Sequence, residues 1–226
     1  MNRKLMAAAS AGLVALMLAA SLWAGSNLPA DMRLPIHWGL DGQPDGWAGK
    51  WEALLLPPGM AAALSLLFYA LPALEPRKEG LARSGGLYLW GWAAILLMSL
   101  VIEVAVLSPA LGWGIAVDRL IVGGLGVMLA LIGNQLGKSR SMYMIGLRTP
   151  WTLASEEVWI RTHRLAGKLM VLAGAVILVA ALVALPPGVL AAVTLVALLI
   201  SAGVPIVWSW MLWRREGRPS DAGGPS

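Results

Sequence analysis

Six long apolar stretches constrain this chain of 226 residues more than any other feature of its sequence. A helix needs roughly 20 apolar residues to cross about 30 Å of hydrocarbon. The stretches that meet this requirement run from 5 to 24, 53 to 74, 87 to 107, 115 to 136, 169 to 185 and 189 to 213. We therefore predict an all-α integral membrane protein, a bundle of six transmembrane helices with a long outer first loop and a basic inner loop.

The composition of the chain excludes an ordinary water-soluble domain. Hydrophobic residues make up 58% of the sequence and charged residues only 13%, which is too few to cover the surface of a soluble protein. The chain has no cysteine, so disulfides, thiolate metal sites and cysteine nucleophiles are ruled out. The first apolar stretch starts like a signal peptide, but no small-residue cleavage site follows it, and we expect an uncleaved anchor helix.

Basic residues are distributed unevenly between the connections, and this sets the expected orientation. Cytoplasmic loops of membrane proteins carry an excess of lysine and arginine. If the N-terminus is inside, the inner side holds all of the 17 Lys and Arg residues except Arg33, Lys50 and Arg119. We therefore expect both termini in the cytoplasm. The net charge of +5 is explained by this topology, so no direct nucleic-acid partner is predicted.

The spans and connections divide the chain into three predicted parts. Residues 1–74 form an N-terminal two-helix unit that includes an outer loop at 25–52. Residues 75–213 supply four further transmembrane helices, with an inner loop at 137–168 that carries a short amphipathic helix. The polar stretch 214–226 is expected to be a flexible cytoplasmic tail.

The outer loop is acidic and contains candidate metal ligands. Asp41-Gly42 and Asp45-Gly46 are turn pairs, because glycine tolerates a positive φ and aspartate bonds to nearby backbone. His37 with Asp41 and Asp45 would offer imidazole and carboxylate ligands to a divalent cation such as zinc or manganese. We favour the alternative, in which the aspartates cap turns and His37 hydrogen-bonds to the loop backbone, and so predict no cofactor.

The inner loop is basic and leads into the fifth span. Ser155 is a candidate N-cap, and the acidic residues that follow it suit the first turn of a helix. Glu157 and Arg161 have the spacing of an i,i+4 ion pair, and Trp159 and His163 share a helix face by the same spacing. This loop can contact anionic lipid or dock a cytoplasmic partner, and composition favours lipid.

Glu103 is the clear charge inside a predicted span. Arg119 opens the fourth span at the same outer level, so we expect the two side chains to pair between helices. The alternative is a proton- or substrate-binding role in a small transporter or channel, since charges within spans are often functional.

Enzyme motifs are absent from the sequence. It contains no Gly-x-Ser-x-Gly elbow, no phosphate-binding glycine loop and no His-Glu-x-x-His zinc motif. His37 and His163 are expected on opposite sides of the membrane and cannot share a site. We predict that the chain is not an enzyme, with a metal-dependent membrane enzyme as the remaining alternative.

Two long motifs in the polar segments resemble those of a known family. LPIHW at 34–38, followed by GQPDGW at 42–47 and Lys50, resembles the N-terminal domain of unknown function found in the SdpI family. Gly133-Asn134, IGLRTPWTL at 145–153, and Trp159 with THR at 162–164 look like the second signature of that family. The order, the spacing and the six-span layout also match, so the resemblance covers most of the chain.

The resemblance implies a function and a set of site residues. It implies a bacterial plasma-membrane protein that protects a producing cell from a secreted peptide toxin and signals by holding a transcriptional repressor at the membrane. The predicted partners are therefore lipid, the toxin and a cytoplasmic repressor, with no oligomeric state predicted. The expected toxin-binding residues are His37, Trp38, Asp41, Asp45, Trp47 and Lys50. The expected partner-docking residues are Asn134, Gly146, Arg148, Thr149, Pro150, Trp151, Trp159, His163 and Arg164.

Overall fold

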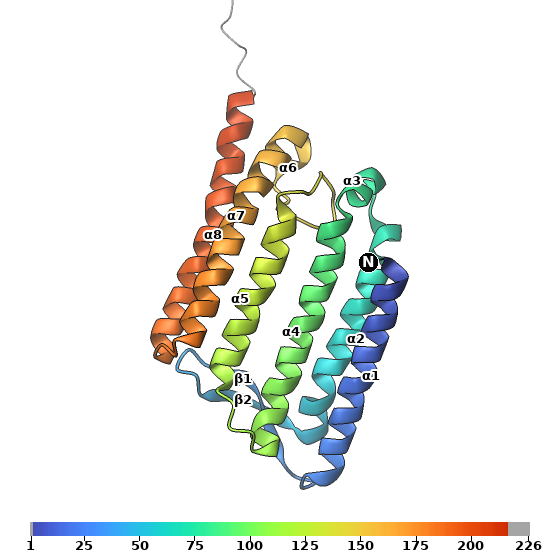
Figure 1. Ribbon diagram of the computed structural model, residues 1–226, viewed down its shortest axis with the longest axis vertical. Helices are drawn as coiled ribbons and strands as arrows, with labels where there is room; N and C mark the ends of the chain where they lie inside the picture. The colour runs from blue at the N-terminus through green and yellow to red at the C-terminus, as the bar shows by residue number, and fades with distance from the viewer. Residues whose placement is uncertain (1, 217–226) are drawn as a thin grey trace, which may run out of the picture.

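The fold is a bundle of long helices with a small sheet at one end (Figure 1). A computed structural model describes residues 2–216, and within them six helices are long and apolar enough to cross a membrane. These are α1 (Arg3–Asn27), α2 (Lys50–Leu74), α4 (Gly85–Leu111), α5 (Val117–Leu136), α7 (Glu156–Leu182) and α8 (Pro187–Glu216). The prediction of an all-α membrane bundle with six spanning helices is confirmed.

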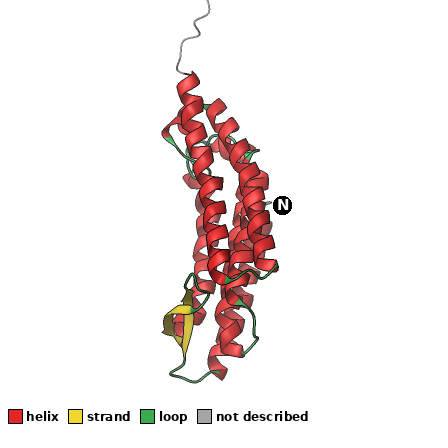
Figure 2. Ribbon diagram, turned by 90° about the vertical axis from the view of Figure 1, so that its left-hand side faces the viewer, coloured by secondary structure: helices red, strands yellow, loops and turns green. Residues whose placement is uncertain are grey.

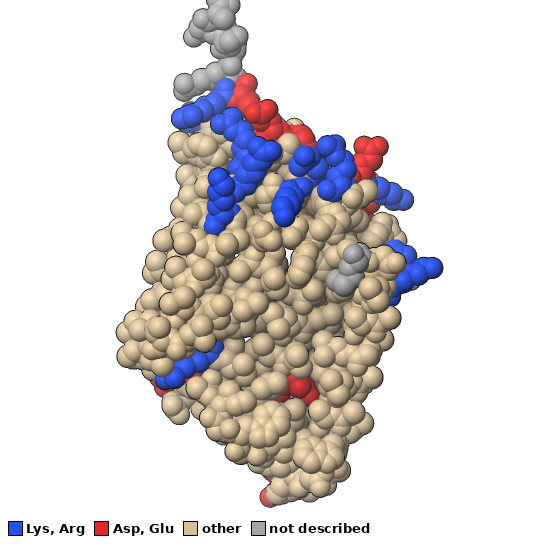
Figure 3. All heavy atoms as spheres, viewed as in Figure 1, with Lys and Arg blue, Asp and Glu red and all other residues tan. Residues whose placement is uncertain are grey.

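The helices pack mainly against their neighbours in the chain. The α1–α2 pair contacts α4, α4 contacts α5, and α7 and α8 continue the bundle beyond α5 (Figure 1). The strands β1 (Arg33–Trp38) and β2 (Pro44–Gly49) lie at one end, which we call the hairpin end (Figure 2). The short helices α3 (Lys78–Arg83) and α6 (Pro150–Ala154) lie at the other. Basic side chains gather there, so we call it the basic end (Figure 3).

Paired glycines bring α5 and α7 closer together than side chains would allow. A Cβ atom at Gly174 would lie 2.4 Å from the carbonyl oxygen of Gly126, and one at Gly167 would lie 2.6 Å from that of Gly133. Both pairs sit on facing backbones of antiparallel helices, as small residues do where membrane helices approach closely. Gly137, four residues after Gly133, is the C-cap of α5.

The start of α7 follows the sequence pattern closely. The Ser155 hydroxyl accepts a hydrogen bond from the Val158 N–H at 3.2 Å, which confirms it as the N-cap. Glu157 and Arg161 form the predicted ion pair, with 3.7 Å between Oε1 and Nη1. The expected amphipathic helix is simply the first part of α7. The five-residue α6 before it was not predicted, because so short a helix carries no periodic apolar pattern.

The outer loop folds into a β-hairpin, which the sequence did not predict. Its strands pair antiparallel with register shifts near His37, and prolines and glycines interrupt the alternation by which strands are recognised. The turn between them confirms the role of Asp41, whose Oδ1 accepts from the Gln43 N–H at 3.0 Å, and Gly42 has a φ of 77°. The loop is also shorter than expected, because α1 and α2 extend to Asn27 and Lys50.

The chain end differs in part from expectation. Helix α8 continues through Glu216, so residues 214–216 are helical rather than part of a flexible tail. Two basic residues in the last turn of α8 complement the partial negative charge of a helix C-terminus. The rest of the predicted tail lies outside the described residues.

Candidate functional site

His37 and Asp45 form a polar contact across the hairpin. The distance from His37 Nδ1 to Asp45 Oδ1 is 2.5 Å, and both side chains are exposed. The prediction that His37 bonds to the loop backbone is therefore wrong. Strand pairing places His37 opposite Gly46, which brings the neighbouring carboxylate within reach. Within residues 2–216 no group of three or more His, Asp or Glu side chains could hold a metal ion, and Asp41 serves the turn instead.

A groove of about 500 Å³ separates the hairpin from the helices beside it. We call it the hairpin groove. Its rim includes His37, Trp38 and Asp118, and its wall continues down α8 from Pro187 to Leu198. Those α8 residues span about 16 Å at 1.5 Å per residue, so the groove extends from the polar hairpin far along an apolar helix. Such a surface suits a ligand with one polar and one apolar side.

The turn of the hairpin closes one edge of this groove. A Cβ atom at Gly42 would lie 3.3 Å from Asp118 Oδ2 and 3.4 Å from the Pro187 ring. The turn therefore rests against the beginnings of α5 and α8. Sequence reasoning missed Asp118 because it opens a span in the ordinary position of a first-turn acid, where the helix dipole alone accounts for it.

The structure separates the outer residues that the sequence grouped together. His37 and Trp38 line the hairpin groove, and Asp45 acts on it through His37. Trp47 is about half exposed on β2 but does not line the groove. Lys50 is buried, and its Nζ donates to the Leu28 carbonyl at 2.8 Å. Lys50 therefore fixes the start of α2 and is not available as a ligand contact.

Glu103 does not form the expected pair with Arg119, so that prediction is wrong. Its side chain, 3% exposed, faces α1, where Glu103 Oε1 lies 2.7 Å from the Ser21 hydroxyl. That same hydroxyl lies 2.7 Å from the carbonyl oxygen of Leu54. Pro58, four residues after Leu54, has no N–H to offer that carbonyl. Ser21 thus joins α1 to both α2 and α4.

Ser21 has one proton and two neighbouring acceptors. If Ser21 donates to Leu54, a protonated Glu103 supplies the hydrogen bond that the hydroxyl then accepts. The second carboxyl oxygen of Glu103, Oε2, is buried and has no hydrogen-bond partner among the described residues. A neutral carboxyl also avoids the high cost of an unpaired charge in an apolar interior.

We expect Ser21→Ala to destabilise the bundle more than Glu103→Gln. The alanine leaves the buried Leu54 carbonyl and the Glu103 carboxyl without their shared partner, which costs about 1–3 kcal/mol, whereas glutamine can still donate to Ser21. Ser10→Ala is the matched control, because Ser10 is also buried on α1 but bonds only to the Met6 carbonyl of its own helix. Thermal unfolding in detergent measures the stability of all three variants. Equal losses for Ser10→Ala and Ser21→Ala would contradict this account of the three-helix junction.

At the basic end, the inner motif is an internal structure. The rings of Trp159 and His163 stack with centroids 3.9 Å apart, and both residues are 0% exposed. His163 Nδ1 donates to the Trp159 carbonyl at 2.8 Å, and Nε2 accepts from the Leu147 N–H at 2.9 Å. Gly146 is required beside them, since its φ is 120° and a Cβ atom would lie 2.7 Å from His163 Nε2.

The remaining residues of the inner motif divide between internal contacts and the surface. Thr149 caps α6, and the Trp151 indole N–H donates to the Ser209 hydroxyl on α8. Arg148 is exposed and donates to the Tyr143 carbonyl at 2.7 Å. Among the predicted docking residues, those with exposed surface are Asn134, Arg148, Pro150 and Arg164. Trp159 and His163 cannot contact a partner directly.

Glu75 organises the same region and was missed from the sequence. Its carboxylate is 1% exposed and accepts from the backbone N–H groups of Arg77 at 2.9 Å, Tyr143 at 3.0 Å and Met144 at 2.8 Å. It therefore ties the end of α2 to the loop after α5. An acid directly before Pro76, at an end rich in basic residues, was the available signal.

These features define a six-helix membrane protein with a polar hairpin at one end and a buried His–Trp motif at the other. Residues 138–209 match the model of the SdpI/YfhL protein family, and residues 12–62 match that of a domain of unknown function, DUF1648. A relative, the immunity protein SdpI of Bacillus subtilis (strain 168), is 29% identical over 146 residues, which cover 65% of this chain and 68% of the relative. The chain is therefore similar to proteins of the SdpI family. No solved structure matches it.

Proposed function

We propose that this chain is a membrane immunity protein that protects its bacterial cell by binding a secreted peptide toxin in the hairpin groove. The name of the relative, an immunity protein, supports the general role. The groove itself carries the specific proposal, because its polar rim and long apolar wall match the two faces of a membrane-active peptide. We assign the chain no enzymatic activity.

The proposed role requires the hairpin end to face outward. The excess of lysine and arginine at the basic end supports this orientation, since positive residues are retained in the cytoplasm (Figure 3). Both termini then lie on the cytoplasmic side of the plasma membrane. A toxin arriving from outside meets the hairpin first, and the groove leads from there along α8 into the apolar part of the bundle.

The chemistry of the groove favours an amphipathic cation as the ligand. The carboxylates of Asp118, on the rim, and Asp45, beside His37, attract positive charge at short range. The apolar wall, which includes Leu195 and Leu198, offers area to the apolar face of the peptide. A peptide held in this way would be diverted from the lipid that it attacks.

We expect Ala191→Trp to abolish protection and Ala192→Trp to preserve it. Ala191 lines the hairpin groove, so an indole there occupies the space proposed for the toxin. Ala192 is the next residue of α8 and lines a different hollow, against α7. The measurement is the toxin concentration that kills a sensitive Gram-positive host expressing each variant. The groove variant should lower this threshold by about tenfold or more, the effect of losing roughly 1.4 kcal/mol of binding.

Two further variants test the rim of the groove. His37→Ala and Asp45→Ala should each reduce protection, whereas Asp31→Ala, an exposed carboxylate before β1, should not. Membrane levels of every variant are compared by immunoblot. Full protection by Ala191→Trp together with both rim variants would exclude the hairpin groove as the toxin site.

The resemblance also implies recruitment of a cytoplasmic repressor, and we propose the basic end as its surface. The residues available there are the exposed members of the inner motif, Asn134, Arg148, Pro150 and Arg164. The buried Trp159–His163 pair would act indirectly, by holding the loop that carries Arg148.

Transport is a second candidate function, and Glu103 is the observation that favours it. A buried carboxyl with an unpartnered oxygen within a spanning helix is typical of proton- and ion-binding sites. Purified protein in liposomes tests this directly. A proton or ion flux that vanished in Glu103→Gln would favour transport, because that variant is expected to fold.

A further inference from the structure

A second groove, of about 570 Å³, lies between the ends of α5 and α7 at the basic end. We call it the basic groove. Its polar lining consists of Asn134, Lys138, Arg164 and Lys168. Among residues 2–216 no acidic side chain lines it, so the groove presents three positive charges and one amide to an occupant.

The three cations are free of internal partners in the described part of the chain. Lys138, Arg164 and Lys168 are exposed, and none forms a salt bridge or a side-chain hydrogen bond with residues 2–216. The nearby basic residues differ, since Arg140 faces Glu156 and Arg161 pairs with Glu157. The charge of the basic groove is therefore available to an anion from outside the protein.

Glycines keep the groove open between these cations. Gly133, Gly137 and Gly167 contribute backbone without side chains to its lining, at one of the two levels where paired glycines bring α5 and α7 close together. The carbonyl groups at the end of α5 carry partial negative charge. An anion in this groove would thus be held by the three side chains and not by the helix end.

The α7 side of the groove changes from charged to apolar along a single face. Arg164 and Lys168 are followed at helical spacing by Val171, Leu172 and Ala175, which line the same groove. Val171 and Leu172 are exposed large hydrophobic residues. The basic groove therefore has a charged part nearest the basic end and an apolar part nearer the middle of the bundle.

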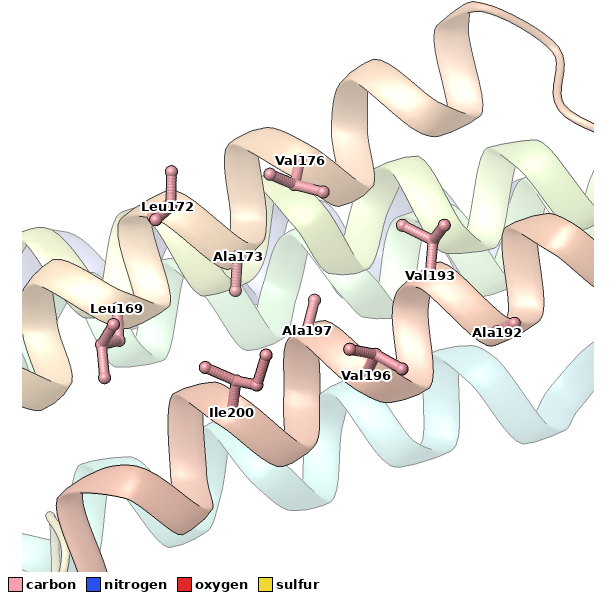
Figure 4. A pocket seen from close by; sticks show the side chains of 9 residues that line it. All are labelled: Leu169, Leu172, Ala173, Val176, Ala192, Val193, Val196, Ala197 and Ile200. Carbon is pink, nitrogen blue, oxygen red and sulfur yellow. The ribbon is translucent and has the colours of Figure 1, made fainter.

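Leu172 also lines an apolar crevice between α7 and α8 (Figure 4). The crevice has a volume of about 410 Å³, and its side chains, which include Leu169, Val176 and Val196, are all apolar. The two hollows thus meet at Leu172. A molecule with a charged head and two hydrocarbon chains could follow both.

We propose that the basic groove binds the phosphate head group of an anionic phospholipid, with its acyl chains along Val171, Leu172 and Ala175 and into the α7–α8 crevice. The charges match a phosphodiester, and their position at the end of spanning helices matches the depth of a head group. A free anion would use the cations alone, whereas the continuous apolar surface fits a lipid.

The test is native mass spectrometry of the full-length protein in detergent with added phosphatidylglycerol or phosphatidylcholine. We expect phosphatidylglycerol adducts at lower lipid concentration than phosphatidylcholine adducts. The triple variant Lys138→Gln, Arg164→Gln, Lys168→Gln should raise the apparent Kd for phosphatidylglycerol by about tenfold or more, as expected for the loss of three surface cations. Ala175→Trp, which fills the apolar part of the groove and leaves its charges intact, should also weaken the binding of phosphatidylglycerol.

The matched control removes three charges from the same end outside the groove: Lys4→Gln, Lys78→Gln, Arg83→Gln. These side chains are exposed and do not line the basic groove. An equal loss of affinity for phosphatidylglycerol in the two triple variants would show a general electrostatic attraction to the basic end and would overturn the proposal. Equal binding of both lipids would also overturn it. The proposal would also be overturned if glycerol phosphate displaced phosphatidylglycerol while Ala175→Trp left lipid binding unchanged. That result would identify a site for free anions. If the groove triple variant fails to fold, the affinity of Ala175→Trp for phosphatidylglycerol tests the proposal instead.

Discussion

Replacing Gly174 by leucine is expected to prevent α5 and α7 from packing and to cost about 3 kcal/mol or more of stability, at the upper end of the range for overpacked cores. The new Cβ atom would lie 2.4 Å from the Gly126 carbonyl oxygen and 2.8 Å from the Ala130 nitrogen. Both are backbone atoms, so no side-chain rotation relieves the clash. The helices must separate, and the second glycine pair, Gly133 with Gly167, separates with them.

Gly203→Leu is the matched control for this variant. Gly203 also lies within a spanning helix, α8, but a Cβ atom there meets nothing within 4 Å. It should fold like the unaltered chain, with a small gain from the better helix propensity of leucine. Size-exclusion chromatography and thermal unfolding in detergent measure both variants. Equal melting temperatures would mean that the two helices can move apart without cost.

Replacing Glu75 by alanine is expected to disorder the basic end and to cost about 3 kcal/mol or more, since each buried donor left unsatisfied costs about 1–3 kcal/mol. Three backbone N–H groups, those of Arg77, Tyr143 and Met144, would lose their common acceptor. Each is held where water has little access, because the carboxylate between them is 1% exposed. Glu75→Gln should also destabilise, since its amide nitrogen would face donors.

Glu79→Ala is the control for charge, because Glu79 is an exposed acid of the neighbouring α3. Its loss should change stability by less than about 0.5 kcal/mol, as is usual for surface substitutions. Hydrogen–deuterium exchange locates the effect: Glu75→Ala should increase exchange at residues 140–148 and leave the hairpin end unchanged. Unaltered exchange at 140–148 would show that the carboxylate does not hold this loop.

The spanning helices could be predicted from the sequence because lipid imposes one dominant requirement. A backbone that crosses hydrocarbon must satisfy its own hydrogen bonds, and an apolar stretch of sufficient length therefore becomes a helix. The N-cap Ser155 and the Glu157–Arg161 pair were predictable for a similar reason, since both depend only on residues within one turn of each other.

The candidate sites depend on contacts between segments that are distant in the sequence, and sequence patterns do not reveal such contacts. The sequence places Glu103 and Arg119 at the same depth in the membrane, but depth alone does not determine which face of α4 carries Glu103. Its contact, Ser21, lies 82 residues away. The hairpin groove similarly combines β1, α5 and α8, whereas sequence reasoning treated the outer loop by itself.

The inner motif was recognised but its role was not. Resemblance marked Trp159 and His163 as important residues, and their i,i+4 spacing placed them on one face. Their burial follows from Gly146, whose positive φ lets the loop pass directly over the two rings. Whether a side chain lies beneath such a loop or on the surface depends on the path of the backbone. The sequence pattern alone does not determine that path.

The junction between β2 and α2 has a mechanical consequence. The strand ends at Gly49 and the helix begins at Lys50, without an intervening loop. The buried Lys50 side chain anchors this joint to the Leu28 carbonyl, while the turn at Gly42 rests on α5 and α8. The hairpin is thus attached directly to α2, and Lys50 anchors the joint. A ligand that displaced the turn from α5 and α8 would transmit force to the start of α2, one helical turn before the Leu54 carbonyl that meets Ser21.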